Sequence, residues 1–547
     1  TLIPFGLAIT VFRLRRDVYL EQMPPLPVLL GVLAVAGSVT LVLFFFGPRI
    51  FRSGAGVLVR PVVALTALLG IVGSGAIAAG FIASGEGARE TRSGIPADLA
   101  DRPNIILVMV DTLRADHLSC YGADILTPNL CGLAEKGGSQ FEAFSHASWT
   151  KPATASLVSS LLPPSHKAHS KVAALSQDVE HVAEVLQRTG YATGGIAANI
   201  NLAPSFGFDQ GYDEYRYLGP DYLAGAEESS SKIILYQIAR SVWFKLAPGL
   251  RFGDFYQDSK VVNEVAFDFL ERHKDTRFFL FLHYMDPHDP YFEHPYNGNG
   301  VARVSTPHPD PAMAEELREL YKGEIEYLDR NFGALLAKLD KLDLLDDTVI
   351  ALTADHGEEF YEHGGWWHGL TLYDEQIHVP LLFKWAAGNN PIPEGATAQI
   401  ARHIDVVPTL LVQAGAEVPS MMQGTSLTVD PGSRSAKDRE VYSEEDHEAN
   451  VLWSLRTRDT KLIVANPGNP RGLPERAYFR VGEDPDETHN LAGNSHAAAE
   501  QELERHADAH RSFAEGQAVA GSDVKMTLEE CEQLRMLGYV EDCSHIN

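Results

Sequence analysis

The feature that most constrains the fold is a set of short apolar runs that alternate with amphipathic segments along the chain. The run NIILVMV and others like it are almost entirely apolar, which is typical of strands buried on both faces of a parallel sheet. The amphipathic segments have the apolar spacing of helices that cover such a sheet. The pattern therefore predicts an α/β fold with helices on both faces. The predicted strands are residues 104–110, 192–198, 277–284 and 348–353, and the predicted helices are residues 178–189, 260–273 and 315–341.

Acidic and histidine side chains follow three of these strands, at the point where each strand ends. Because ligand sites in such sheets lie at the carboxyl ends of the strands, we expect these side chains to meet. Carboxylate oxygens and an imidazole nitrogen suit a divalent cation such as Ca²⁺, Mg²⁺, Mn²⁺ or Zn²⁺. A run of solvated charges, the alternative, has no reason to recur at strand ends. The side chains are Asp111 after the first strand, Asp286 and His288 after the third, and Asp355, His356 and His368 after the last.

A single threonine, Thr150, lies in the stretch SHASWTKPATASLVSSLLPP, just before a segment of small residues. Taken alone, a threonine here is typical of a helix N-cap. A cation held by Asp111, Asp355 and His356 would instead activate its hydroxyl as a nucleophile towards a phosphate or sulfate ester. The local sequence leaves both interpretations open.

Charge and cysteine content narrow the function classes. The formal net charge of −28 over 547 residues argues against a nucleic-acid surface, which needs clustered Lys and Arg. The four cysteines fall into two close pairs, Cys120 with Cys131 and Cys531 with Cys543, and neither pair has the spacing of a zinc site. Two short-loop disulfides and free buried thiols are both compatible with this spacing.

The N-terminal part departs from the acidic composition of the rest. Residues 26–47 and 62–83 are uncharged and long enough to cross a bilayer, and residues 1–12 resemble the end of another span. We therefore expect a transmembrane region at 1–84 and a small, polar linker at 85–101. Basic residues flank the spans about equally on both sides, so the positive-inside rule does not fix the orientation.

Several motifs in order resemble landmarks of the sulfatases, a family of the alkaline phosphatase superfamily. They include PNIILVMVDTLRADHLSCYG, SWTKPATASLVSSLLPP, HYMDPHDPY, TADHGEEFYEHG, WHGLTLYDEQIHVPLL and HIDVVPTLLVQAGAEVPSMMQGTSL, with LRTRDTKLIV, AYFRVGEDPDETHNLAG and LEECEQLRMLGYV in the C-terminal part. The resemblance implies a mixed-sheet catalytic domain at 102–428 with a metal-bound nucleophile. It also implies a smaller antiparallel subdomain at 429–547, with its strands packed by a helix.

The chain departs from this family at the positions that matter most for chemistry. Formylglycine-dependent sulfatases carry Cys or Ser, any residue, Pro, any residue and Arg, whereas residues 150–154 read TKPAT. We therefore expect no formylglycine. Thr112 replaces an acid of the family's aspartate pair, no lysine stands near 199–201, and His368 approximately matches another family lysine.

The resemblance assigns roles to the remaining residues. His288 would give a proton to the leaving oxygen or contact the anion, and Asp286, His288 and His368 could hold a second cation. The predicted metal ligands are Asp111, Thr150, Asp355 and His356, the predicted catalytic residues are Thr150, His288 and His368, and the predicted substrate-binding residues are Lys151, Asn199 and Asn201.

These residues favour a hydrolase of sulfate or phosphate esters. A formylglycine hydrate sheds sulfate by collapsing to an aldehyde, which threonine cannot do, whereas a phosphothreonine is open to in-line attack. Fewer cations also suit a singly charged phosphodiester better than a dianion. The alternatives are a transferase of phospho-head-groups and a catalytically inactive binding protein. We expect a sulfated or phosphorylated envelope lipid or glycan as substrate, no nucleic acid, and a multi-pass membrane location with the catalytic domain outside the cytoplasm; the oligomeric state stays open.

Overall fold

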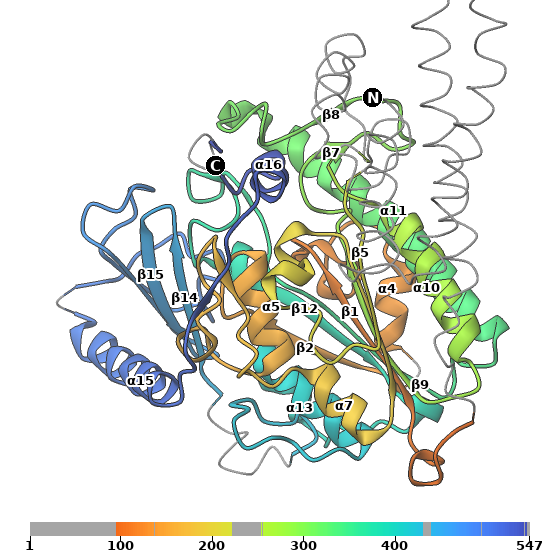
Figure 1. Ribbon diagram of the computed structural model, residues 1–547. Helices are drawn as coiled ribbons and strands as arrows, with labels where there is room; N and C mark the ends of the chain where they lie inside the picture. Colours follow the sequence, from red (N-terminus) through yellow and green to blue (C-terminus); the bar gives the residue numbers. More distant parts are fainter. Residues whose placement is uncertain are drawn as a thin grey trace, which may run out of the picture. The chain divides into compact units, whose positions relative to one another are not determined.

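A computed structural model describes residues 94–543, except 136, 221–252, 254, 430–438, 494 and 541. Its main feature is an eight-stranded mixed sheet (Figure 1). The neighbouring strands β9, β1, β6, β4 and β5 run parallel, whereas β12 is antiparallel to both β9 and β2. In spatial order the strands are β13 (Ala401–Arg402), β2 (Ser139–Phe144), β12 (His378–Lys384), β9 (Thr348–Ala354), β1 (Asn104–Val110), β6 (Phe278–Tyr284), β4 (Ala192–Ala197) and β5 (Glu214–Tyr217).

The central strands explain why the sequence folds this way. All seven residues of β1 are buried, as are all those of β4, β6 and β9, so both faces of the sheet centre are covered. The α/β fold and its mixed sheet are thus confirmed, and the four predicted strands match within one residue at each end. The register aligns Val110 with Tyr284 on one side and with Ala354 on the other, so three strands end level with one another.

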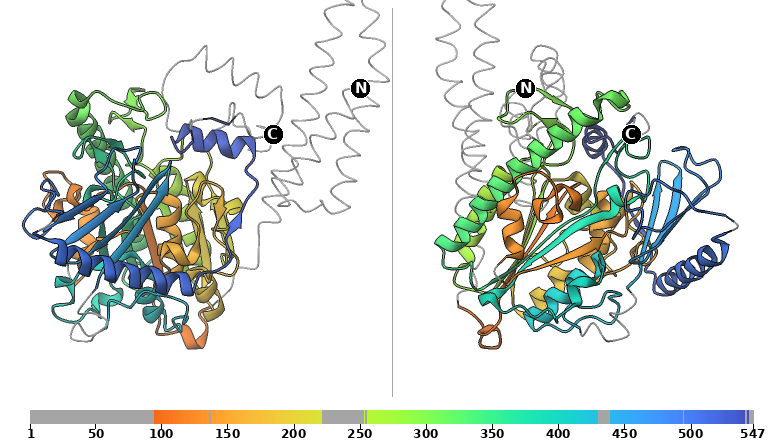
Figure 2. Two further views of the ribbon diagram at one scale, coloured as in Figure 1. Left: turned by 90° about the vertical axis from the view of Figure 1, so that its left-hand side faces the viewer. Right: turned by 180° about the vertical axis from the view of Figure 1, so that it is seen from behind.

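Helices cover both faces of the sheet, as Figures 1 and 2 show. One layer contains α5 (Thr150–Ser159), α7 (Val182–Thr189) and α13 (His403–Ala414), and the other contains α4 (Pro128–Cys131), α10 (Ser259–His273) and α11 (Ala314–Lys341). The predicted helix at 178–189 begins later than expected because His181 and Glu184 form a capping box there. The short helices α6 (Pro163–His166) and α12 (Asp374–Ile377) lie in loops.

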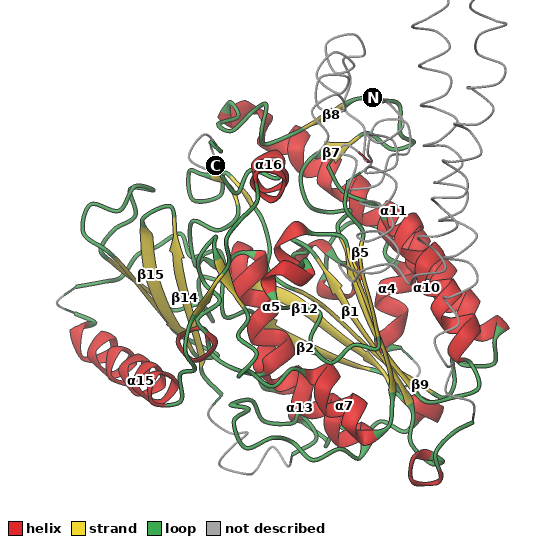
Figure 3. Cartoon of the chain, viewed as in Figure 1, coloured by secondary structure: helices red, strands yellow, loops and turns green. Residues whose placement is uncertain are grey.

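A second, antiparallel sheet follows the main one in the sequence (Figure 3). Helix α15 packs on this sheet through Leu503 and Ala507, which meet Leu455, Leu462 and Tyr478. The sheet consists of β14 (Val441–His447), β15 (Asn450–Arg456), β16 (Lys461–Ala465) and β17 (Arg476–Phe479), and α15 spans Ala497–Gly516.

The C-terminal segment then leaves the second sheet and returns to the main domain. Strand β18 (Ser522–Asp523) pairs with β3 (Ala173–Ala174), and α16 (Leu528–Met536) follows. Two short antiparallel strand pairs lie in loops that follow the main strands. They are β7 (Tyr291–Phe292) with β8 (Gly300–Val301), and β10 (Glu359–Phe360) with β11 (Trp366–Trp367). All four cysteines are paired, Cys120 with Cys131 and Cys531 with Cys543.

The membrane part of the predicted fold class and the predicted membrane location are corrected. No helix among the described residues combines the length and the apolar character needed to cross a bilayer. The longest of them, α11, has 28 residues but carries acidic and basic side chains along one side, as a surface helix does. The two ranges that prompted the expectation, 26–47 and 62–83, lie outside the described residues.

Candidate active site

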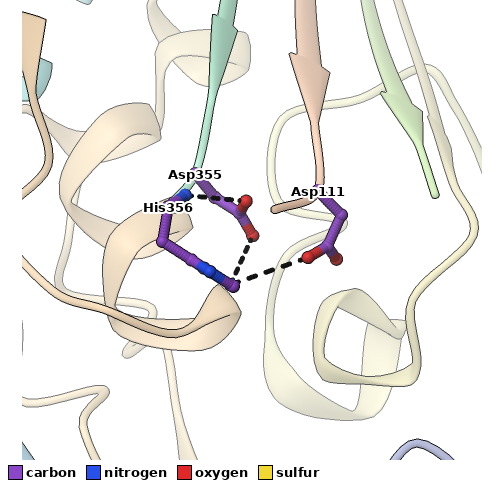
Figure 4. A group of neighbouring side chains, drawn as sticks. All are labelled: Asp111, Asp355 and His356. Atoms are coloured by element: carbon purple, nitrogen blue, oxygen red, sulfur yellow. Dashed lines mark hydrogen bonds and ion pairs between the residues drawn. The ribbon is translucent and has the colours of Figure 1, made fainter. Parts of the chain in front are cut away.

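Three of the predicted metal ligands meet at the carboxyl ends of β1 and β9, and Figure 4 shows them facing one another. Asp111 directly follows β1, and Asp355 and His356 directly follow β9. The Nε2 atom of His356 lies 3.6 Å from Oδ1 of Asp111 and 3.4 Å from Oδ2 of Asp355. One ligand atom from each residue lies within 4.8 Å of the others.

Hydrogen bonds from the surrounding backbone and side chains hold this arrangement. Oδ1 of Asp355 accepts hydrogen bonds from the backbone N–H groups of Thr112 and His356, at 3.2 and 2.8 Å. Asn199, two residues beyond β4, donates its side-chain N–H to Oδ2 of Asp111 at 2.8 Å. Nδ1 of His356 lies 2.9 Å from the Gly357 carbonyl, to which it can donate, and this leaves Nε2 free to face the acids.

Thr150 is the first residue of α5, one position after the helix cap, so its hydroxyl is not used to close the helix. Trp149 takes the cap position without a side-chain hydrogen bond. The Thr150 hydroxyl oxygen lies 3.5 Å from Oδ2 of Asp111 and 3.4 Å from Nε2 of His356. The N-terminal end of a helix carries partial positive charge, which favours negative charge on a hydroxyl at this position.

The two acids are compensated by histidines and by no lysine or arginine of the described residues. No Lys or Arg among the described residues forms a hydrogen bond or ion pair with Asp111 or Asp355, and both side chains are fully buried. Burial and the charge of Asp111 raise the pKa of Asp355 well above its ordinary value. Burial opposes ionisation of Asp111 as well, but the histidines His288, His283 and His356 hold its pKa below the ordinary value.

The donor set fits a divalent cation. Within the described part of the chain, Oδ1 of Asp111 and Oδ2 of Asp355 accept no hydrogen bond although they are buried. Buried carboxylate oxygens without a partner are costly unless a cation compensates them. Two ligand atoms that bind one Ca²⁺ ion at right angles lie about 3.3 to 3.7 Å apart, which matches the spacings around Thr150 and His356.

His288 and His368 lie beside this cluster. The His368 ring is 4.6 Å from the His356 ring and 4.9 Å from the His288 ring, measured between centroids. Nδ1 of His288 lies 2.6 Å from the Asp289 carbonyl, and Nδ1 of His368 lies 3.1 Å from Oε1 of Glu358. Each histidine is thus fixed through Nδ1, which leaves its Nε2 for a reacting group.

Asp286 points elsewhere. Its Oδ1 accepts hydrogen bonds from the backbone N–H and the hydroxyl of Ser259, at 3.1 and 2.8 Å, beside the start of α10. The possible second cation set of Asp286, His288 and His368 is not among the metal-ligand groups found in the described residues.

His283 is a residue that sequence reasoning gave no role. Its Nε2 lies 3.3 Å from Oδ2 of Asp111, and its side chain is fully buried. It belongs to β6, opposite Met109 of β1, so the strand register places it next to the site. In the sequence, its position as the second-last residue of a predicted strand is a signal that it lies near the strand ends where the site forms.

The three predicted substrate-binding residues behave differently. Asn199 contacts the site, and the buried side-chain amide of Asn201 has no hydrogen-bond partner in the described residues. Lys151 turns away: its ammonium group donates to the carbonyls of Ser170 and Lys171 and lies 3.7 Å from the Phe206 ring centroid. Burial lowers the pKa of Lys151 to about 7. This placement does not favour a substrate-binding role for Lys151.

Tyr539 is the largest departure from the sequence-based picture. Its hydroxyl lies 2.8 Å from the Thr150 hydroxyl and 3.2 Å from Nε2 of His288, and it accepts a hydrogen bond from Asn199 at 3.3 Å. It comes from the C-terminal segment, 389 residues from Thr150 in sequence.

Comparisons with family models and with known proteins find related chains. A family model described as Sulfatase matches residues 103–416, and one described as N-sulphoglucosamine sulphohydrolase, C-terminal, matches residues 361–512. The chain is 24 % identical to N-acetylglucosamine-6-O-sulfatase of Bacteroides thetaiotaomicron, covering 73 % of this chain and 84 % of that protein. It is 26 % identical to the multifunctional alkaline phosphatase superfamily protein PehA of Trinickia caryophylli, covering 73 % and 93 %.

Solved structures share the fold. A phosphonate monoester hydrolase of Agrobacterium radiobacter superposes with a TM-score of 0.57 at 20 % identity, covering 76 % of this chain and 96 % of that one. The structure of BT4656 in complex with its substrate D-glucosamine-2-N,6-O-disulfate has a TM-score of 0.57 at 21 % identity, covering 76 % and 98 %.

Proposed function

The chain belongs to the sulfatase family, whose members are sulfuric ester hydrolases, and from this premise we propose that unmodified Thr150 is the nucleophile of a metal-dependent ester hydrolase. The observation that carries the proposal is the position of the Thr150 hydroxyl between Asp111 and His356, at the start of α5. Threonine stands where the family has its convertible Cys or Ser, and a hydroxyl at this place can attack an ester directly.

Asp111, Asp355 and His356 would hold the cation, and Thr150 would complete its ligand set. A divalent cation there supplies a Lewis acid that lowers the pKa of a neighbouring hydroxyl and polarises an ester oxygen. Asn199 keeps Asp111 oriented through the hydrogen bond to Oδ2. These buried contacts fix the direction from which the hydroxyl can attack.

The chain's own residues then account for the proton balance. The Thr150 oxygen forms a bond to phosphorus or sulfur as the bond to the leaving oxygen breaks. His288 is placed to donate a proton from Nε2 to that oxygen, because its Nδ1 is fixed at the Asp289 carbonyl. The proton that Thr150 loses passes to Oδ2 of Asp111, to which the hydroxyl donates at 3.5 Å. Water then attacks the ester on Thr150 and gives a proton back to His288, while the Thr150 oxygen recovers its proton from Asp111 as the product leaves.

The charge of the site supports a phosphodiester over a dianionic ester. Asp111 and Asp355 have no Lys or Arg partner among the described residues, and Lys151 is engaged elsewhere, so a dianion would meet little compensating charge. Threonine also lacks the aldehyde route by which sulfate leaves a formylglycine hydrate. The similarity to N-acetylglucosamine-6-O-sulfatase supports a sulfated or phosphorylated glycan as the wider substrate class.

The test is a substrate panel with a nucleophile series. The purified protein is assayed with matched aryl phosphodiester, phosphomonoester and sulfate substrates across Ca²⁺, Mg²⁺, Mn²⁺ and Zn²⁺. We expect the highest kcat/KM with the phosphodiester, loss of turnover in Thr150→Ala, and partial turnover in Thr150→Ser, whose primary hydroxyl can do the same chemistry.

Two results would contradict the proposal. Sulfatase turnover without phosphodiesterase activity would overturn the phosphodiester preference. Turnover that survives Thr150→Ala, with Thr150→Ser as the matched control, would overturn the nucleophile itself.

A further inference from the structure

The reactive end of the site is covered by the chain's own C-terminal segment. Thr150, Asp111 and His356 have 0 % exposed surface, and Tyr539, which lies against Thr150, has 1 %. In the described residues, Thr150 thus leaves no exposed surface to a substrate whose phosphorus or sulfur must come within bonding distance of its oxygen. The covering group therefore has to move before any turnover.

The end of α16 sets the direction of Tyr539. The backbone N–H groups of Gly538 and Tyr539 donate to the carbonyls of Arg535 and Leu534, at 3.1 and 2.8 Å, a pattern that closes a helix. Gly538 has φ +76°, in the left-handed region, and a side chain there would come within 2.5 Å of Arg303. The turn at Gly538 thus sends Tyr539 into the main domain.

The segment is held by apolar contacts and a covalent link. Leu534 and Leu537 are buried in the same core as the main sheet, as is the Tyr539 ring. The disulfide between Cys531 and Cys543 closes a loop around Tyr539. Burial of these apolar side chains favours the docked position of the segment over a detached one.

The Tyr539 hydroxyl occupies the place of a reacting oxygen. Its three partners are Thr150, His288 and Asn199, which are the nucleophile, the proton donor and the residue that orients Asp111 in the proposed reaction. A tyrosine that assisted turnover would have to leave room for the transferred group between itself and the nucleophile. Here the two hydroxyl oxygens are only 2.8 Å apart.

We propose that residues 528–540, tethered by the Cys531–Cys543 disulfide, form an autoinhibitory strap. The strap blocks the site by placing the Tyr539 hydroxyl against Thr150, and it must leave for an anionic substrate to bind. The proposal rests on the proposed function for the identity of the nucleophile. If only a small fraction of the molecules has an open strap, the apparent Kd for a substrate equals the intrinsic Kd divided by that fraction. A closed strap therefore weakens the apparent affinity.

Point variants in the full chain test the strap. Tyr539→Ala removes the blocking side chain, and Leu534→Ala weakens docking of α16 without touching the site. Leu503→Ala is the matched control, because this buried leucine packs α15 on the second sheet instead. Calorimetric binding of inorganic phosphate and of sulfate is measured for each, alongside kcat/KM for the best substrate of the panel.

We expect both strap variants to bind one of these anions at least about tenfold more tightly than the unaltered protein, and Leu503→Ala to bind it equally. Tyr539→Phe, which keeps the ring, should keep or raise turnover. Loss of turnover in Tyr539→Phe would overturn the proposal and make Tyr539 a catalytic residue. Lower anion affinity in Leu534→Ala would also overturn the proposal.

Anion binding separates this proposal from the proposed function. If no ester is turned over by any variant but both strap variants gain anion affinity, the proposed function fails and the strap stands. If esters are hydrolysed and the strap variants change neither anion binding nor kcat/KM, the strap proposal fails and the proposed function stands.

Discussion

Where the second sheet meets the main domain, the buried Glu487 and the partly buried Asp374 lie beside Lys461. Asp111 and Asp355 at the strand ends have no lysine or arginine partner among the described residues. The Lys461 ammonium lies 2.7 Å from Oδ1 of Asp374 and 2.8 Å from Oε1 of Glu487, and it is fully buried. Arg456 adds a second cation, with its Nη2 3.0 Å from Oδ2 of Asp374.

Each pair contains one acid whose pKa is lowered, Asp374 or Asp111, and one whose pKa is raised, Glu487 or Asp355. Burial opposes the charge of Asp374, but Arg456 and Lys461 hold its pKa below the ordinary value. Burial raises the pKa of Glu487 to about 7 and, together with the charge of Asp111, raises that of Asp355 well above its ordinary value. The pairs therefore differ in the groups that compensate them and not in the direction of the shifts. Among the described residues, the chain thus supplies Lys and Arg to one pair of acids and only histidines to the other, which supports a metal site at the strand ends.

The largest effect should separate the two clusters in catalysis. Asp355→Asn is expected to lower kcat/KM by about a thousandfold or more, because altering even an outer partner of a metal ligand costs about 10- to 100-fold. Asp374→Asn should keep most of the kcat/KM per folded molecule. The comparison would break if the two variants lost similar activity per folded molecule in steady-state assays.

For the free energy of unfolding we expect the opposite order, with a loss at Lys461 and none at Asp355. Lys461→Met leaves Asp374 and Glu487 buried without their shared cation, and we expect the free energy of unfolding to fall by about 3 to 5 kcal/mol. Asp355→Asn in metal-free protein removes repulsion between acids and should leave stability equal or higher. Urea unfolding in EDTA measures both, with Lys322→Met at the exposed Glu319 pair as a control worth less than about 1 kcal/mol.

The smallest expected effect is the stabilisation that added metal gives. At a free metal concentration of 100 times Kd, the unaltered protein should gain about 2.7 kcal/mol, because the cation binds only the folded site. Asp374→Asn should gain the same increment, and Asp111→Asn should gain none. An equal gain in Asp111→Asn would place the bound cation elsewhere in the molecule.

The parts of the site that could be predicted from the sequence are those set by local pattern. Asp111, Asp355 and His356 follow buried strands, and the topology of a parallel sheet is enough to bring strand ends together. Lys151 faces away from Thr150 because neighbouring residues on a helix point about 100° apart. Nothing in the local pattern distinguishes those two directions.

The remaining contacts depend on long-range packing. Tyr539 reaches Thr150 only because the chain leaves the second sheet, pairs β18 with β3 and docks α16 on the main core. His283 reaches Asp111 through the register of β1 and β6. Neither residue lies in a sequence motif that indicates which residue it contacts. These two contacts can therefore be recognised only in the folded structure.

The most direct test of the account is the chemical state of Thr150 during turnover. The protein is mixed with an aryl phosphodiester and its preferred divalent cation, quenched rapidly in acid, digested and analysed by mass spectrometry. We predict an unmodified Thr150 before mixing and a phosphoryl adduct on Thr150 after it, absent in Thr150→Ala. An adduct on another residue, with Thr150 unmodified throughout turnover, would contradict the account.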